Sequence, residues 1–291
     1  MKNIFYFPED KVMASNLSSK SNIEMGIAET RYFPDEKIYI RITSEVKDKI
    51  IFLFCSLDHP NNKILSLLFM AKTLKELGAT KICLISPYLP YMRQDKSFKS
   101  GEAITAIIFS KFISTFIDQL ITIDPHLHRI KNLSEIFNIL TSNLHLIHEI
   151  SEWIRNNISA PHLIGPDEES SQWVREIANA LKAPFSIIKK IRHGDRDVTI
   201  SVPDINDTSK TPVLIDDIIS TGTSMMAVIH DLISRGFKHP TCIGVHALFD
   251  ENTYRKFLNS GAQKIITSHS IANFSNEIDI TDVIAEVLKK C

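Results

Sequence analysis

The chain has 291 residues, of which 33 are Lys or Arg and 34 are Asp or Glu. This length suffices for one large domain or for two of ordinary size, and we expect two. The near-neutral balance lacks the basic excess that is typical of nucleic-acid-binding proteins, so any anion site should be local. No apolar run approaches the roughly 20 residues that a membrane-spanning helix requires, and we expect a soluble, cytoplasmic protein that binds neither nucleic acid nor membranes.

The first half of the chain alternates strand-like and helical patterns. Apolar, strand-like runs at residues 49–57, 81–91 and 119–126 are separated by helical patterns at 64–78 and 104–116. This order is typical of parallel strands joined by crossover helices.

The second half repeats the same order. Strand-like runs lie at residues 161–167, 185–191, 212–217 and 241–249, with helical patterns at 170–183, 225–237 and 252–262. We therefore expect an α/β protein with two similar domains, each a mainly parallel sheet flanked by helices. The boundary should lie near TSNLHLIHEIS, which gives domains of residues 1–145 and 146–291.

The cysteines are spread along the chain without the paired spacing of metal ligands. Most of them lie in or beside apolar stretches. We expect reduced and mostly buried thiols at all four positions, which are Cys55, Cys83, Cys242 and Cys291.

Polar clusters follow four of the predicted strands. They are SPYLPYMRQD at residues 86–95, DPHLHR at 124–129, GPDEESS at 165–171 and DDIISTGTS at 216–224. In an open parallel sheet, ligands bind at the carboxyl ends of the strands. The four clusters therefore predict a catalytic edge at which they converge.

The segment at residues 216–224 has the chemistry of an anion cradle. It has neither the glycine spacing and Lys of a nucleotide-binding P-loop nor a G-x-G-x-x-G turn. Gly222 allows the backbone to approach closely, and hydroxyl donors come from Thr221, Thr223 and Ser224. The helix that follows adds unpaired N–H groups and the positive end of its dipole. This combination suits a phosphate monoester.

The two carboxylates of this segment extend the prediction to a sugar. Asp216 and Asp217 precede the cradle and are acceptors for the neighbouring hydroxyls of a ribose. An ordinary capped loop with two solvated aspartates is the alternative. The double acid after an apolar run, with hydroxyls on both sides of the glycine, favours a ribose 5-phosphate site.

Two further segments carry charges suited to phosphate chemistry. Arg93, Gln94 and Asp95 offer a guanidinium fork, an amide and a carboxylate at one turn, before a polar stretch at residues 96–101 that is typical of a lid. Lys190 and Arg192 occupy alternate positions of a strand and so point the same way. A plain surface loop and a solvated basic run are the alternatives.

In order along the chain, these segments resemble the ribose-phosphate pyrophosphokinase family, also called phosphoribosyl diphosphate synthetases. DDIISTGTS resembles the loop that this family shares with phosphoribosyltransferases, and SPYLPYMRQDKSFKSGEAIT resembles the synthetase segment that binds ATP and carries a flexible loop. RYFPDEKIYIRI resembles the adenine-contacting F-P-D motif, DPH the metal-binding D-x-H, and KIR the catalytic K-x-R. The resemblance extends from about residue 31 to the C-terminal DITDVIAEVLKK.

The resemblance implies two domains of the type I phosphoribosyltransferase fold and the transfer of the diphosphoryl group of ATP to the 1-hydroxyl of ribose 5-phosphate. It implies Mg²⁺ as cofactor and a homodimer or a hexamer built of dimers. The implied catalytic residues are Lys190 and Arg192, and the implied metal ligands are His126 and Asp167. ATP binding is implied for Phe33, Asp35, Arg93, Gln94 and Asp95. Ribose 5-phosphate binding is implied for Asp216, Asp217, Ser220, Thr221, Gly222, Thr223 and Ser224.

The chain departs from the commonest bacterial pattern of this family at a few positions. Ser220 replaces a frequent aspartate, which resembles archaeal-type members, and Thr223 replaces a small residue. Lys96 replaces a frequent arginine of the lid, and Glu36-Lys37 replaces Gly-Glu after the F-P-D motif. A phosphoribosyltransferase and a catalytically silent regulatory homologue are the alternative functions.

Overall fold

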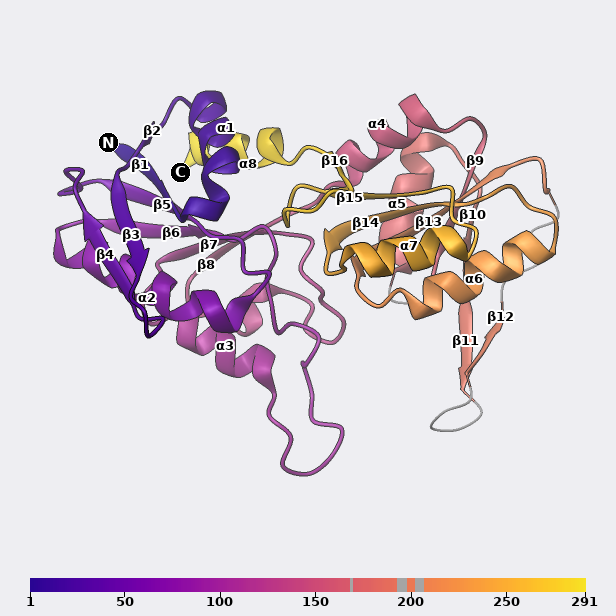
Figure 1. The fold of residues 1–291 in the computed structure, drawn as a ribbon, viewed down its shortest axis with the longest axis horizontal. Helices are drawn as coiled ribbons and strands as arrows, with labels where there is room; N and C mark the ends of the chain where they lie inside the picture. Colours follow the sequence, from indigo (N-terminus) through magenta and orange to yellow (C-terminus); the bar gives the residue numbers. More distant parts are fainter. Residues whose placement is uncertain (168–169, 193–197, 202–206) are drawn as a thin grey trace. The chain divides into compact units, whose positions relative to one another are not determined.

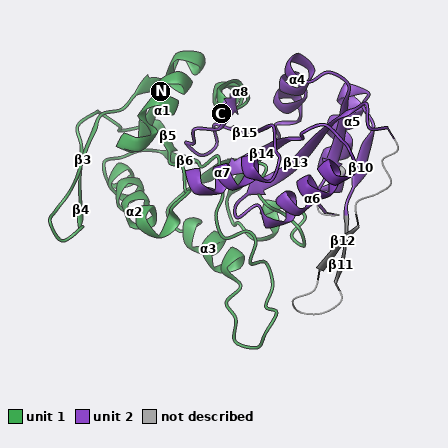
Figure 2. Ribbon diagram, turned by 45° about the vertical axis from the view of Figure 1, so that its right-hand side comes forward, with its two compact units in different colours: residues 1–144, 281–291 green, residues 145–280 purple. Residues whose placement is uncertain are grey.

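The computed structural model describes residues 1–167, 170–192, 198–201 and 207–291, and of residues 172, 189–192 and 198–201 it describes only the backbone. The chain forms two compact units (Figure 2). Unit 1 contains Met1–Leu144 and Thr281–Cys291, and unit 2 contains His145–Ile280. Each unit has its own α/β architecture, so the predicted fold class is confirmed.

Unit 1 is built on a six-stranded parallel sheet with the strand order β2-β1-β5-β6-β7-β8 (Figure 1). Residues in the central strands are almost all buried, as expected of a parallel sheet that is covered on both faces. The strands are β1 (Lys2–Tyr6), β2 (Glu24–Met25), β5 (Ile50–Phe54), β6 (Lys81–Ile85), β7 (Gln119–Ile123) and β8 (Leu140–Leu144).

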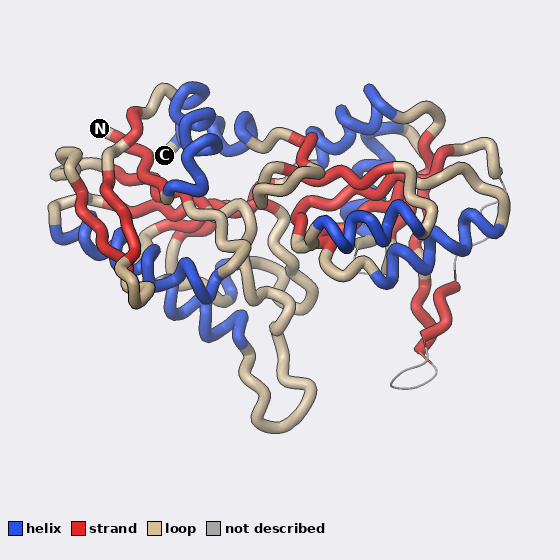
Figure 3. Tube along the Cα trace, in the orientation of Figure 1, coloured by secondary structure: helices blue, strands red, loops and turns tan. Residues whose placement is uncertain are grey.

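Helices cover both faces of this sheet. Helices α1 (Lys11–Ser21) and α8 (Thr281–Lys290) lie together on one face, and α2 (Pro60–Glu76) and α3 (Thr105–Ile113) cover the other (Figure 3). An antiparallel hairpin, β3 (Ala28–Tyr32) and β4 (Ile38–Ile42), packs its isoleucines against the same core as α2 and α3.

The last helix returns to unit 1. Lys20 of α1 forms an ion pair with Asp282 of α8 at 2.6 Å, and the Nζ of Lys2 donates to the carbonyl oxygen of Leu288 at 2.9 Å. The sequence analysis placed residues 281–291 in the second domain, whereas these contacts make them part of unit 1.

Unit 2 repeats the architecture with the strand order β10-β9-β13-β14-β15-β16, again with parallel neighbours. The strands are β9 (Pro161–Gly165), β10 (Phe185–Ile187), β13 (Thr211–Ile219), β14 (Thr241–Ala247), β15 (Lys264–Ser268) and β16 (Asn276–Ile278). Helices α4 (Ile147–Asn157) and α5 (Ser171–Leu181) cover one face, and α6 (Thr223–Ser234) and α7 (Glu251–Asn259) cover the other (Figure 1). A separate hairpin is formed by β11 (Lys189–Arg192) and β12 (Val198–Ser201).

Two short 3₁₀ helices, η1 (Pro8–Asp10) and η2 (Leu133–Glu135), complete the described elements. Cys55, Cys83 and Cys242 are buried and Cys291 is partly exposed, and all four are free thiols, as predicted. Within the described part of the chain, no helix combines the length and the apolar character needed to cross a membrane.

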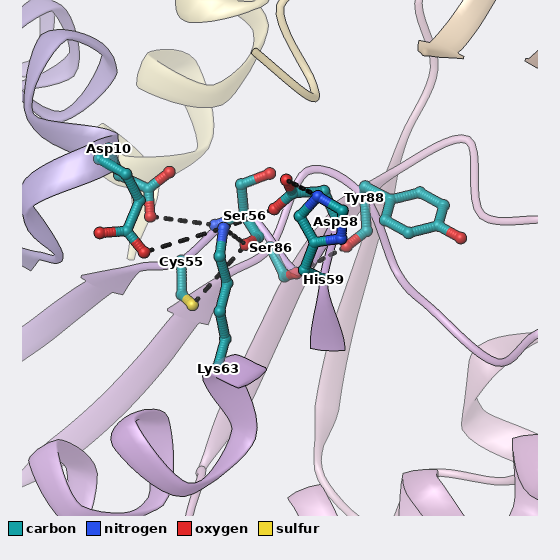
Figure 4. A network of polar contacts seen from close by, with 9 residues as sticks. Asp10, Cys55, Ser56, Asp58, His59, Lys63, Ser86 and Tyr88 are labelled. Atoms are coloured by element: carbon teal, nitrogen blue, oxygen red, sulfur yellow. Dashed lines mark hydrogen bonds and ion pairs between the residues drawn. The ribbon is translucent and has the colours of Figure 1, made fainter. Parts of the chain in front are cut away.

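A buried ionic cluster lies where β1 and β5 end in unit 1 (Figure 4). The Oδ2 atom of Asp10, a residue only 8% exposed, accepts a hydrogen bond from the backbone N–H of Ser56 at 3.3 Å. Lys63 at the start of α2 donates to the carbonyl oxygen of Ser56 at 2.8 Å and pairs with Asp58, and its Nζ lies 3.9 Å from Glu9. The cluster thus joins the segment of Glu9 and Asp10 to residues 56–63, which lie more than 40 positions further along the chain.

Burial raises the pKa of Asp10 to about 7, and the charge of Lys63 opposes this less strongly. Glu9 and Asp58 raise the pKa further, while the N–H of Ser56 lowers it. The pKa of an aspartate in the unfolded chain is about 3.8. At a pH between this value and about 7, Asp10 is therefore protonated in the folded state and ionised in the unfolded state.

We predict that Asp10 makes the folded protein less stable as the pH rises from about 4 to about 7, by on the order of 4 kcal/mol. Asp10→Asn should remove this contribution, so the difference in unfolding free energy between variant and wild type should grow over that interval and stay constant above it. Urea unfolding across the interval measures this. The exposed Asp282→Asn is the control, and an Asp10→Asn variant with the wild-type pH slope would contradict the prediction.

Candidate active site

The carboxyl end of β13 carries two adjacent carboxylates in unit 2. The strand continues through Ile219, so Asp216 and Asp217 lie inside it and not after it as the sequence suggested. The Oδ1 atom of Asp216 accepts the N–H of Asp217 at 3.0 Å, and the Oδ1 atom of Asp217 accepts the N–H of Ile218 at 2.8 Å. These bonds orient both side chains from their own backbone.

Asp167 places a third carboxylate near this pair. It follows β9, which is the parallel neighbour of β13 in the register Leu214 opposite Ile164. Burial raises the pKa of Asp216 well above its ordinary value, and the charges of Asp217 and Asp167 raise it further. Negative charge is therefore concentrated here, and a bound cation or the hydroxyl groups of a ligand would stabilise it.

The loop after β13 turns sharply into α6. Gly222 has a φ of +66° and is the N-cap residue of this helix. A Cβ atom at Gly222 would overlap the ring of Phe257 from α7, so both the backbone conformation and the close contact require glycine here. Thr223 is the first helical residue.

The first turn of α6 is arranged as an anion site. Because the N-cap residue is a glycine, no side chain caps this turn. The first N–H groups of a helix have no intrahelical acceptor, and the dipole there is positive. The hydroxyls of Thr221 and Thr223 lie 3.4 Å apart, and both side chains are exposed. Ser220 and Ser224 are half-buried on either side of them.

The backbone of the predicted catalytic pair forms strand β11. Lys190 pairs with Ile200 and Arg192 with Val198 of β12, so the two residues stand at alternate positions of the strand. Their side chains lie outside the described part of the structure.

In unit 1, the predicted ATP-binding segment follows β6 through a proline-rich turn. Arg93 is exposed. The Oε1 atom of Gln94 accepts the hydroxyl of Thr105 at 2.7 Å, which ties this segment to the start of α3. Asp95 accepts hydrogen bonds from both the side chain and the backbone N–H of Arg129, at 2.7 and 3.1 Å. Burial alone would raise the pKa of Asp95, but the bonds to Arg129 outweigh this effect and hold the pKa below its ordinary value.

The predicted metal ligand of unit 1, His126, follows β7. The turn begins at Asp124, which is 6% exposed and has a φ of +36°. His126 is half-buried. In the residues that the structure describes, no three His, Cys, Asp or Glu side chains gather as a metal site.

The turn of the β3–β4 hairpin carries the predicted adenine contacts. The guanidinium of Arg31 lies 4.7 Å from the ring centres of both Phe33 and Tyr39, so one face of Phe33 is covered by a cation. Asp35 forms an ion pair with Lys37 at 2.8 Å. The residue that departs from the family pattern thus neutralises the carboxylate of the motif.

Known proteins match both units. A model of the N-terminal domain of ribose phosphate pyrophosphokinase matches residues 2–116, and a model of the phosphoribosyl transferase domain matches residues 133–280. The chain is similar to a ribose-phosphate pyrophosphokinase of Saccharolobus solfataricus, with 33% identity over 92% of both chains. It is also similar to one of Sulfurisphaera tokodaii, with 31% identity over 94% of this chain and 95% of the relative. The chain belongs to the ribose-phosphate pyrophosphokinase family.

A solved structure agrees with this pyrophosphokinase fold along the whole chain. The phosphoribosylpyrophosphate synthetase of Mycobacterium smegmatis superimposes with a TM-score of 0.86, at 20% identity, over 99% of this chain and 97% of that one. The structural match confirms the two-sheet fold, and the family models and relatives confirm the family that the sequence motifs suggested.

Two residues that shape the candidate sites could not be predicted from the sequence. Phe257 lies within an ordinary helical pattern, and no local signal marks it as the residue that contacts Gly222. Arg129 is the last residue of the polar cluster DPHLHR, in which only the DPH motif suggested a role, and its partner Asp95 precedes it by 34 positions. Only the folded chain brings these residues together.

We predict that Gly222→Ala destabilises the protein more than Gly236→Ala does, by about 1–3 kcal/mol for the forced contact with Phe257. Gly236 is a matched control because its φ is also positive, +82°, and no atom lies within 4 Å of the position of its Cβ. Urea unfolding of the two variants measures the difference. Equal losses would show that backbone conformation alone requires the glycine.

Proposed function

We propose that this chain transfers the diphosphoryl group of ATP to the 1-hydroxyl of ribose 5-phosphate, giving 5-phosphoribosyl 1-diphosphate and AMP. Membership of the pyrophosphokinase family supports the reaction. The single structural observation that supports it best is the acidic pair Asp216–Asp217 inside a parallel strand, followed at once by the uncapped N-terminus of α6.

In this proposal, ribose 5-phosphate binds at the loop between β13 and α6. Its phosphate accepts hydrogen bonds from the first N–H groups of α6 and from the hydroxyls of Thr221, Thr223 and Ser224. Asp216 and Asp217 accept from the ribose hydroxyls, which supply the donors that the crowded carboxylates favour. Ser220 and Gly222 complete the loop.

In this proposal, ATP binds to side chains of unit 1, including those of the β3–β4 hairpin. Arg93 contacts the phosphates, Gln94 contacts the nucleotide, and Phe33 stacks its free face on the base. Asp35 accepts from the exocyclic amino group of adenine, although Lys37 already neutralises its charge. Lys190 and Arg192 stabilise the charge on the transferring diphosphoryl group.

Mg²⁺ fits the donor chemistry of the candidate site. This ion usually takes one or two protein carboxylates and completes its shell with waters and substrate phosphates, so a three-residue protein cluster is not required. In unit 2, Asp167 supplies a carboxylate beside the crowded Asp216–Asp217 pair. In unit 1, His126 is the proposed ligand, directly or through water. When bound, the ion neutralises charge on the phosphate oxygens of ATP.

We also infer that the protein is a cytoplasmic homodimer or a hexamer, as the resemblance implies. One assay tests the proposed reaction: release of AMP from ATP, with and without ribose 5-phosphate and Mg²⁺. AMP release that requires all three supports it. Failure of the purified chain in this assay would favour the silent homologue, and consumption of phosphoribosyl diphosphate by a free base would favour a phosphoribosyltransferase.

Asp217→Ala should raise the Michaelis constant for ribose 5-phosphate by about 10- to 100-fold, the equivalent of about 1.5–3 kcal/mol for a lost hydrogen bond to a charged acceptor. The constant for ATP should change little, because Asp217 faces the sugar in this proposal. Asp217→Asn, which keeps an acceptor for the N–H of Ile218, is the matched variant. An unchanged Michaelis constant for ribose 5-phosphate in both variants would remove Asp217 from the site.

A further prediction concerns the selection of the base. Because Lys37 pairs with Asp35, the carboxylate that would discriminate adenine is partly satisfied before a nucleotide binds. We expect ATP to be used with only a modest preference over GTP and CTP, and Lys37→Glu to increase that preference. The ratios of kcat/KM for the three nucleotides measure this. Strict use of ATP by the wild type would show that other contacts select the base.

A further inference from the structure

Arg129 contacts two residues at the predicted lid of unit 1, one just before the lid and one within it. Its Nη1 atom donates to the Oδ1 atom of Asp95 at 2.7 Å, and its backbone N–H donates to the Oδ2 atom of the same residue at 3.1 Å. Its guanidinium carbon lies 5.8 Å from the centre of the Phe98 ring. Asp95 directly precedes the lid at residues 96–101, and Phe98 lies within it.

The carboxylate of Asp95 is occupied by this contact. Its side chain is only 3% exposed, whereas that of Arg129 is 40% exposed. Both oxygens already accept hydrogen bonds from Arg129, and these bonds lower the pKa of Asp95 against the effect of its burial. The geometry is therefore that of an anchor for the chain and not of a carboxylate held ready for a ligand.

Two cations lie near the ring of Phe98, which is 69% exposed. The Nζ atom of Lys96 lies 4.5 Å from the ring centre on the lid itself, and Arg129 approaches the ring from the loop after β7. The lid has its own internal turn, in which the carboxylate of Glu102 accepts the N–H groups of Phe98 and Lys99 at 2.7 and 2.9 Å. Arg129 thus joins an already folded turn to a different loop.

We propose that Arg129 is the positioning residue of this lid: by binding Asp95 and Phe98 it sets the place of residues 95–102 relative to the loop that carries His126. The proposal rests on the proposed function, because it assigns the lid to the ATP site. The proposal also gives Asp95 a different role from the ATP contact that the resemblance implied. Asp95 holds residues 95–102 in place through its bonds to Arg129. Arg93 and Gln94 then meet the nucleotide from a segment that is fixed at its end.

This arrangement explains why a positioning contact needs an arginine. A planar guanidinium can bind a carboxylate with one edge and lie against an aromatic ring with its face, whereas an ammonium group interacts as a point charge. A misplacement of about 1 Å in a group that positions reactants can lower the rate by about 10²-fold. We therefore expect Arg129 to affect turnover more than it affects the binding of ribose 5-phosphate.

The first experiment measures steady-state kinetics of Arg129→Gln, with Arg255→Gln as the matched control. Arg255 also pairs with an acid, Glu251, at 2.7 Å, but on the exposed surface of α7. Arg129→Gln should lower kcat by about 10- to 100-fold and leave the Michaelis constant for ribose 5-phosphate within about twofold. Arg129→Lys, which keeps only the charge, should recover part of this loss. The control should match the wild type.

The second experiment does not depend on activity. The lid contains Lys96 and Lys99, each followed by a serine, so trypsin can cut it at either position. Arg129→Gln should be cut there at least about fivefold faster than the wild type and the control, because cleavage follows the population of the displaced segment. Mass spectrometry of the fragments identifies the two cuts.

A double-mutant cycle covers the case in which Arg129→Gln leaves Asp95 buried without a partner and fails to fold. Asp95→Asn with Arg129→Gln removes both charges, and an anchor requires the double variant to lose less than the product of the two single effects. Wild-type turnover and wild-type cleavage in Arg129→Gln would overturn the proposal. An inactive wild type would refute the proposed function instead, and the cleavage rates would still test Arg129.

Discussion

The contact between Gly222 and the ring of Phe257 is the packing constraint on which the candidate ribose-phosphate site depends. Phe257 is fully buried in the core between α6, α7 and the sheet of unit 2. The chain leaving β13 must therefore turn within three residues, through a left-handed glycine, to begin α6 against that ring. This turn brings the start of the helix next to the two aspartates, so a phosphate and a sugar can be bound by neighbouring residues.

The same edge of the sheet places the carboxyl group of Asp216 beside those of Asp217 and Asp167. Burial and two neighbouring carboxylates raise its pKa. A ligand that brings hydroxyl donors or a metal ion would relieve this repulsion. The free energy that folding spends on crowding these acids is thus available to favour the substrate complex. The acids of unit 1 differ in this respect, since Asp95 is paired with Arg129 and the cluster around Asp10 includes Lys63.

The two units use one architecture for different chemistry. Each has a six-stranded parallel sheet with polar loops at the carboxyl ends of its strands. In unit 2 a glycine turn begins α6 without a side-chain cap, whereas in unit 1 the loops after β1 and β5 meet at the ionic cluster around the buried Asp10. The proposed ligand-binding groups of unit 1 include those of the loops after β6 and β7, where Arg129 contacts both Asp95 and Phe98.

The sequence by itself determined the class of fold and the family, and it predicted which loops carry the chemistry. Local patterns were sufficient for this, because strand and helix periodicity, the DDIISTGTS loop and the ordered motifs are each readable within a few residues. The end of β13 was the local exception. The chain continues in the sheet through Ile219 because β14 offers pairing partners as far as Ala247. A local sequence pattern does not show which strand a segment will pair with.

Only the tertiary structure decided which distant residues meet. The order of the strands, the return of α8 to unit 1, the ring beneath Gly222 and the partner of Asp95 all join positions that are dozens to hundreds of residues apart. The raised pKa of Asp10 also depends on the tertiary structure. Its cause is burial, and the residues next to Asp10 in the sequence do not indicate that it is buried. Such contacts arise from the packing of whole elements, whereas the motifs arise from the chemistry that a single loop must perform.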